Sequence, residues 1–95
     1  MTYNLSYHLD VKKIDLPKID NKNKSMIKRV LEERLITHPE VYGKPLQRTL
    51  KGYWKLRVGN YRVIFKISEH DILILGIMDR KSIYSQIKNR KFNQD

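Results

Sequence analysis

The sequence predicts an α+β fold, a small antiparallel sheet of about four strands packed with two N-terminal helices. Residues 53–84 alternate apolar and polar side chains on both sides of the two-residue turn Gly59-Asn60, which is typical of a β-hairpin followed by a third strand. Residues 21–37 carry apolar side chains at the spacing of one helical face. With 95 residues, 40% of them hydrophobic, the chain suffices for a single domain over residues 1–95 with one core.

The first twenty residues are predicted to form one strand and one short helix. Residues 3–7 alternate aromatic or aliphatic residues with polar ones, as a strand does. Asp10 is the expected N-cap of a short helix that holds Val11 and Ile14. Pro17 either ends this helix or restarts the next one, because proline fits only the first turn of a helix.

A longer helix is predicted over residues 21–37, with Asp20 as its N-cap. Pro39 and Gly43 end this helix and open a basic loop, residues 43–52. The helix has one apolar face, made of Met26, Ile27, Val30, Leu31 and Leu35.

The hairpin is predicted to have strands at residues 53–58 and 61–68, joined by a type II′ turn with Gly59 at its first central position. A second turn follows at Glu69-His70-Asp71. This turn type also sets the cross-strand pairs, which are Arg57 with Arg62, Leu56 with Val63, and Trp54 with Phe65.

Residues 72–78 are nearly all apolar, which indicates a central strand covered on both faces. Residues 82–90 form a short C-terminal helix or an irregular tail. The resulting order is strand, helix, helix and three strands, β-α-α-β-β-β. The last three strands are expected to pair as an antiparallel meander, and the first strand lies at an edge or pairs in parallel.

Alternation along the hairpin divides its side chains between two faces. Like charges directly opposite one another destabilise a sheet, so the basic face needs a reason, and an anionic ligand is the simplest one. The other interpretation is a solvated face that protects a strand from edge pairing. The apolar face holds Trp54, Leu56, Val58, Tyr61, Val63, Phe65 and Ile67, and the basic face holds Lys55, Arg57, Arg62 and Lys66 around Ile64.

The chain carries a net charge of +10, from 20 lysines and arginines against 10 acidic residues. This balance favours nucleic acid, an anionic membrane surface or an acidic protein as partner. Between Glu40 and Glu69 there is no acidic residue at all. The chain has no cysteine, no apolar leader and no stretch long enough to span a bilayer, so we expect a cytoplasmic protein without a membrane partner.

The segment Asp79 to Tyr84 follows the central strand directly, and Arg80 is expected at the exit of that strand. Tyr84 either packs on the sheet from a helix or takes part in a site. The three histidines, at positions 8, 38 and 70, have no metal-ligand spacing and are expected at the surface. We expect no metal and no cofactor.

In two segments, KPLQRTLKGYWKLRVGNYRVIFKI and ILILGIMDRKSIY, the chain resembles the RelE/ParE toxin superfamily of bacterial toxin–antitoxin systems. The shared pattern is an L-K-G loop, a strand with basic residues, a G-x-Y-R turn and a strand that ends in R-K-x-x-Y. The size, the basic charge and the order of elements also agree over nearly the whole length.

The resemblance implies a RelE-type ribonuclease that cuts messenger RNA in the ribosomal A site and is blocked by a cognate acidic antitoxin. Many relatives have a histidine where this chain has Asp79, which bears on proton transfer. Other cations are the expected RNA-binding residues, namely Lys44, Arg48, Lys51, Lys66 and Lys81. The catalytic positions carried over from the family are Lys55, Arg57, Arg62, Arg80 and Tyr84.

In the implied reaction the RNA 2′-hydroxyl attacks the adjacent phosphate, and no metal is required. Arg57, Arg62 and Arg80 suit the phosphate, because guanidinium binds phosphate oxygens through two donors. Lys55 is a candidate acid or base, and Tyr84 could orient the hydroxyl or stack on a base. Two alternatives stay open: a ParE-like toxin that acts on DNA gyrase, and a relative that only binds nucleic acid or an antitoxin.

Overall fold

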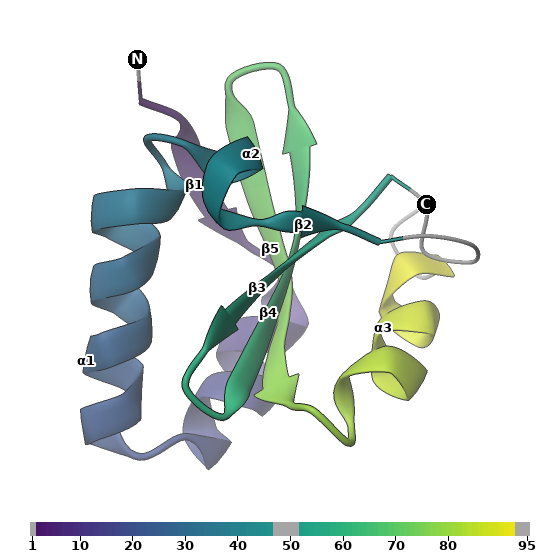
Figure 1. The fold of residues 1–95 in the computed structure, drawn as a ribbon. Helices are drawn as coiled ribbons and strands as arrows, with labels where there is room; N and C mark the ends of the chain where they lie inside the picture. Colours follow the sequence, from purple (N-terminus) through teal and green to yellow (C-terminus); the bar gives the residue numbers. More distant parts are fainter. Residues whose placement is uncertain (1, 47–51, 93–95) are drawn as a thin grey trace.

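The computed structural model describes residues 2–46 and 52–92 and confirms the α+β fold class. It contains a five-stranded sheet in the order β1-β5-β4-β3-β2, one strand more than the approximate four predicted. Figure 1 shows this sheet between helices on its two sides. The strands are β1 (Asn4–Tyr7), β2 (Lys44–Pro45), β3 (Trp54–Val58), β4 (Tyr61–Ser68) and β5 (Asp71–Asp79).

Strand β5 lies inside the sheet, between β1 and β4, as its continuous apolar run predicted. Its partner β1 forms one edge and runs parallel to β5, in the register Leu5 with Ile72. The expectation of an edge position or parallel pairing for the first strand is therefore confirmed in both respects. Strands β3, β4 and β5 pair antiparallel in sequence order.

The hairpin between β3 and β4 has the predicted register, with Leu56 opposite Val63 and Arg57 opposite Arg62. Gly59 has a φ of 59°. Asn60 keeps a negative φ, since Glu69 alone among the described non-glycine residues has a positive one. A positive φ at the first central position only is the type II′ geometry, which glycine adopts without steric cost.

The helical segments begin with a π-helical turn at Val11–Asp15 and a 3₁₀ turn at Leu16–Lys18 that contains Pro17. Val11 is buried but Ile14 is 39% exposed, so only the first contributes to the core. Asp10 directly precedes this turn at the expected position, but its side chain makes no capping hydrogen bond. Its carboxylate instead lies 3.7 Å from Arg90 Nε.

Helix α1 (Asn21–Val30) continues as a π-helical turn, Leu31–Leu35, so the predicted helix ends two residues before Thr37. Its predicted apolar face is confirmed, with Ile27, Leu31 and Leu35 buried. Asp20 is the N-cap residue of α1, as predicted, but its side chain does not cap the helix backbone. Its Oδ1 instead accepts a hydrogen bond from the Asn23 side-chain amide at 2.6 Å.

Two features interrupt the region predicted as a helix end and a loop. Pro39 begins the short helix α2 (Pro39–Tyr42) instead of simply ending the preceding one. The chain then enters β2, whose Lys44 pairs with Lys55 of β3. Residues 47–51 of the predicted loop lie outside the described residues.

The helices cover opposite faces of the sheet (Figure 1), and each face has its own core. The first core packs the N-terminal turns and α1 against the predicted apolar face of the hairpin, with Val63 and Phe65 fully buried. Trp54 is partly buried and stacks on Phe65 with ring centroids 6.4 Å apart. The second core packs α3 (Ile83–Phe92) through Ile83 and Ile87 onto the other face.

Strand β5 contains a β-bulge, beyond which one of its backbone N–H groups bonds a side chain instead of a neighbouring strand. Ile64 pairs with Gly76 but Phe65 pairs with Ile74, so Leu75 is an extra residue. Beyond this bulge the Ile77 N–H points away from β4 and donates to Asp15 Oδ2 at 2.9 Å. Strand β1 pairs with β5 only as far as Ile74, so the Asp15 carboxylate supplies the hydrogen-bond acceptor that the Ile77 N–H would otherwise lack.

The same carboxylate anchors the C-terminal helix. Arg90 donates to both oxygens of Asp15 at 2.7 Å each, and its Nη1 also donates to the Leu75 carbonyl at 3.1 Å. Both side chains are almost fully buried, with Asp15 2% and Arg90 4% exposed. The hydrogen bond from Arg90 raises the pKa of the guanidinium further above its ordinary value. One buried ion pair therefore joins the N-terminal turn, β5 and α3.

Candidate RNA-binding site

The basic face of the hairpin forms a hollow of about 290 Å³ between β2, β3, β4 and the end of α2. Four of the cations that the sequence singles out line it together, because β2 places Lys44 opposite Lys55 and the hairpin places Arg57 opposite Arg62. We call this the basic hollow. Its lining residues are Tyr42, Lys44, Lys55, Leu56, Arg57 and Arg62.

No acidic side chain within the described part of the chain neutralises these four cations. The ion pairs there join Asp10 or Asp15 to Arg90 and Asp10 to His8, all away from the basic hollow. Among the described residues, the Arg62 side chain makes a single long hydrogen bond, from Nη1 to the Tyr61 carbonyl at 3.4 Å. Directly opposed like charges oppose sheet formation, so this arrangement lowers the stability of the sheet unless an anion binds.

Of the other predicted RNA-binding residues, two lie in the described part of the chain but outside the basic hollow, and two lie outside the described residues. Lys66 lies on the same face but farther along β4, with its Nζ 5.8 Å from the centre of the Tyr53 ring. Lys81 is exposed in the turn before α3. Arg48 and Lys51 lie outside the described residues.

Arg80 and Tyr84 are both accessible but do not line the basic hollow in this structure. Arg80 is exposed in the turn after β5, and Tyr84 is 37% exposed near the start of α3. The predicted convergence of Arg57, Arg62 and Arg80 on one phosphate therefore stays a prediction.

Asp79, which stands where many relatives have histidine, organises this turn. Its Oδ1 accepts hydrogen bonds from the backbone N–H groups of Lys81 and Ser82, each at 3.0 Å. The hydrogen bond from Ser82, above all, lowers the pKa of the Asp79 carboxyl below its ordinary value of 3.8. The residue is thus a carboxylate at neutral pH and acts as a cap for the turn that presents Arg80.

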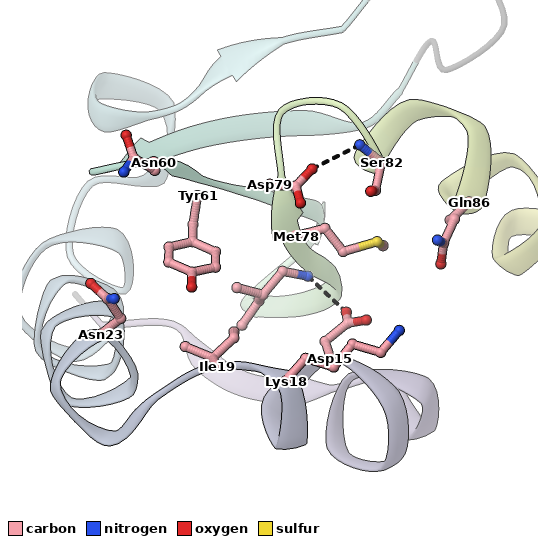
Figure 2. A pocket seen from close by; sticks show the side chains of 11 residues that line it. Asp15, Lys18, Ile19, Asn23, Asn60, Tyr61, Met78, Asp79, Ser82 and Gln86 are labelled. Atoms are coloured by element: carbon pink, nitrogen blue, oxygen red, sulfur yellow. Dashed lines mark hydrogen bonds between the residues drawn. The ribbon is translucent and has the colours of Figure 1, made fainter.

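A second pocket, of about 270 Å³, lies at the end of β5 (Figure 2). Asn60 and Tyr61 from the hairpin end, Ser82 and Gln86 from the C-terminal side, and the N-terminal turns surround it. Its charged lining consists of Lys18 and the carboxylates Asp15 and Asp79. Asp15 is already paired with Arg90, and Lys18 shares the pocket with the Asp79 carboxylate, so the described lining of this pocket offers no cluster of cations. The basic hollow is therefore the better candidate for an anion site.

Sequence reasoning missed two elements of this region. Tyr42 lines the basic hollow with 44% of its surface exposed. An aromatic residue two positions before Lys44, between the predicted helix and the predicted basic loop, was the available signal. The Asp15–Arg90 pair gave no signal, because 75 residues separate its members.

The comparisons with known proteins agree with this architecture. Residues 9–84 match the sequence model of the ParE toxin of the type II toxin–antitoxin system parDE. The match covers most of the chain, which therefore belongs to this toxin family within the RelE/ParE superfamily. No curated protein sequence matches it.

Solved structures of RelE toxins share the fold. The toxin–antitoxin complex RelBE2 from Mycobacterium tuberculosis has 26% identity and a TM-score of 0.79, over 84% of this chain and 100% of that one. A RelE mutant from E. coli in the free state has 16% identity and a TM-score of 0.74, over 99% and 98%. The RelB–RelE complex from Methanococcus jannaschii has 23% identity and a TM-score of 0.65, over 84% and 95%.

The protein is thus a toxin of a type II toxin–antitoxin system. Within the described ranges, 2–46 and 52–92, no helix has the length and apolar character needed to cross a membrane.

Proposed function

We propose that this toxin is a RelE-type endoribonuclease that cuts messenger RNA in the ribosomal A site. The observation that carries the proposal is the basic hollow, where four cations converge and no acidic side chain of residues 2–46 or 52–92 pairs with them, namely Lys44, Lys55, Arg57 and Arg62. Phosphate is the ligand that best fits such a cluster, because arginine offers it paired donors and stays charged.

The proposed reaction needs a base for the 2′-hydroxyl, stabilisation of the charge on phosphorus, and an acid for the 5′-oxygen. The 2′-oxygen attacks phosphorus, its proton passes to a base, the bond from phosphorus to the 5′-oxygen breaks, and that oxygen takes up a proton. Products are a 2′,3′-cyclic phosphate and a 5′-hydroxyl. Arg57 and Arg62 stabilise the charge that develops on phosphorus, which is usually the largest catalytic term. Lys55, half-buried between Lys44 and Arg57, is the proposed proton carrier in the basic hollow.

Arg80 and Tyr84 join this site when RNA is bound, Arg80 on the phosphate and Tyr84 on the 2′-hydroxyl or a base. Both lie outside the basic hollow here, but apo geometry is often looser than that of the substrate complex. Their accessible positions around the turn after β5 are compatible with that movement.

The test is single-turnover cleavage of messenger RNA on programmed ribosomes. Arg62→Ala and Arg80→Ala should each lower the rate about 100-fold or more, the scale of losing one preorganised charge donor. Lys12→Ala is the matched control, since it removes one exposed cation from the N-terminal turn and should leave the rate unchanged. Excess EDTA, with ribosomes kept intact by polyamines, should not stop the chemistry. Wild-type rates in both arginine variants would refute the proposed site.

The proposed inhibitor is an acidic antitoxin that covers the basic hollow. Complexes of RelE toxins with RelB antitoxins are among the similar structures, and the unneutralised cations give this chain a matching surface. Its binding should weaken as salt rises, because exposed charge pairs are screened over roughly 8–10 Å near physiological ionic strength. Recovery of no small acidic partner from the native host would count against the idea.

A second candidate is a toxin that acts on DNA gyrase, and the ParE family match favours it. The two candidates separate in one pair of assays. Gyrase-dependent DNA breaks without ribosome-dependent cleavage would support the gyrase toxin, and the reverse would support the ribonuclease. Neither activity, together with tight binding of an acidic partner, would indicate a relative that only binds.

A further inference from the structure

The end of α2 presents an aromatic ring at the wall of the basic hollow. Tyr42 lines the hollow together with Lys44, Lys55, Arg57 and Arg62, yet 44% of its surface is exposed. Its neighbour Val41 is 74% exposed. We propose that Tyr42 is a stacking platform for a nucleobase next to the phosphate held in the basic hollow; this subsite rests on the proposed RNA-cutting function.

The backbone beneath this ring is held in place by close packing. Gly43 donates its N–H to the Pro39 carbonyl at 2.9 Å, which closes the single turn of α2. A Cβ on Gly43 would lie 2.6 Å from Phe65 Cζ and 2.9 Å from the Pro39 carbonyl oxygen. Only glycine lets the chain approach the fully buried Phe65 ring this closely, so the end of α2 has a fixed place against β4.

Strand β2, which follows Gly43, connects this fixed backbone to the cations of the basic hollow. Directly after Gly43 the chain enters β2, which lies beside β3 (Figure 1). Lys44 of β2 pairs with Lys55 of β3. Tyr42 is therefore two residues from a cation of the basic hollow and is tied to the same strand pair. Because the backbone that carries the ring is already held in place, less conformational entropy is lost when a ligand stacks on it.

The chemistry around the ring favours a base over other occupants. Single-stranded RNA binds where a cationic groove follows the backbone and aromatic rings take the bases. The backbone N–H of Tyr42 bonds the His38 carbonyl, but its hydroxyl makes no hydrogen bond within the described residues that would fix the ring in a structural role. One exposed tyrosine and one valine are too small an apolar surface to form a protein interface by themselves, since a stable interface buries about 800 Å² on each partner. The antitoxin proposed above would therefore bind the hollow mainly through its cations, and the ring is assigned to a base.

Stacking has a spectroscopic signature that a purely structural role lacks. The probe is a short single-stranded RNA with one 2-aminopurine, whose fluorescence is quenched when the base stacks. Wild-type protein should quench it, and binding is followed in parallel by anisotropy at low salt. Tyr42→Phe keeps the ring and should retain both signals. Tyr42→Ala should lose the quenching and weaken binding roughly 5- to 150-fold, the range for loss of one base stack.

Two controls separate stacking from other effects. Lys44→Ala should weaken binding and reduce its salt dependence, but should still quench at saturating protein. The exposure of Tyr42 predicts that Tyr42→Ala melts within a few degrees of wild type, so a folding defect is recognisable.

The subsite is overturned if Tyr42→Ala quenches and binds as wild type does, or if wild type does not bind the probe at all. The subsite is also overturned, in favour of a protein interface, if Tyr42→Ala binds an acidic helical peptide less tightly than wild type does but binds the RNA probe equally well. Failure of the ribonuclease proposal looks different. In that case wild type binds and quenches the probe but does not cut messenger RNA on programmed ribosomes.

Discussion

Replacing Arg90 with methionine removes the cationic half of the buried pair while keeping much of the side-chain volume. Asp15, 2% exposed, would then keep the Ile77 N–H as its remaining partner. Removing one partner of a buried pair costs about 3–5 kcal/mol, because the other charge stays buried without compensation. Small domains have only about 5–15 kcal/mol of stability, so the loss is a large part of the total.

The melting temperature gives the direct assay. For a domain of this size, about 1 kcal/mol corresponds to roughly 4–8 °C, so Arg90→Met should melt roughly 12–40 °C lower. Asp10→Asn is the control. Asp10 reaches Arg90 only at 3.7 Å and is a third exposed, so its loss should cost under about 1 kcal/mol.

A double-mutant cycle isolates the pair. Asp15→Asn keeps an oxygen for the Ile77 N–H, so it removes mainly the charge. Combined with Arg90→Met it should cost clearly less than the two single losses together, because no buried charge is then left alone. A melting temperature of Arg90→Met within a few degrees of wild type would refute the reasoning and mean that α3 is not held by this pair in solution.

Three further outcomes are expected. Leu56→Ala should lower the free energy of unfolding by about 2–5 kcal/mol, since Leu56 is 7% exposed in the first core, and an unchanged melt would mean that the hairpin register is shifted. Gly76→Ala should cost roughly 1–3 kcal/mol because the new methyl meets Ile87 Cδ1, and equal stability would show that α3 sits farther from β5. The lowered pKa of Asp79, held by the Ser82 N–H, means that its stabilisation is present above pH 3.8 and is lost as pH falls through the lower folded value. The melting-temperature gap between wild type and Asp79→Ala should therefore narrow below about pH 4, and a gap that stays constant down to pH 2 would contradict this cap.

The parts of the fold that the sequence predicted are those set by local rules. Gly59 fixes the turn, and the turn fixes which residues of β3 and β4 face each other, so Leu56 met Val63 as expected. Strand β2 could not be found this way, because a two-residue strand has no period to detect. The bulge at Leu75 was hidden for a related reason, since a run that is apolar on both faces shows no alternation to break.

In the candidate site, too, local rules predicted some residues, while tertiary packing placed others that no local pattern could predict. Arg57 and Arg62 were predicted as neighbours from the hairpin register alone, and the structure confirms the pair. Tyr42 reaches the basic hollow only because α2 packs on Phe65, a contact that no local pattern encodes. Arg80 was carried over by family resemblance, and its place relative to the hollow depends on a turn whose geometry Asp79 sets.

The C-terminal helix also determines how much of the basic face stays open. Ile64 lies directly opposite Lys55 on β3, on the face of the hairpin that carries the cations, yet α3 buries it completely. On β4, the second core therefore ends at Ile64, and the basic hollow begins two residues earlier in the chain, at Arg62. Arg90 fixes the far end of α3 against Asp15, so a change there reaches the hollow through helix position and stability rather than through contact. RNA cleavage by Arg90→Met should for this reason be compared with wild type at equal fractions of folded protein. A deficit that persists after this correction would mean that α3 itself touches the RNA, which is the role proposed for Tyr84.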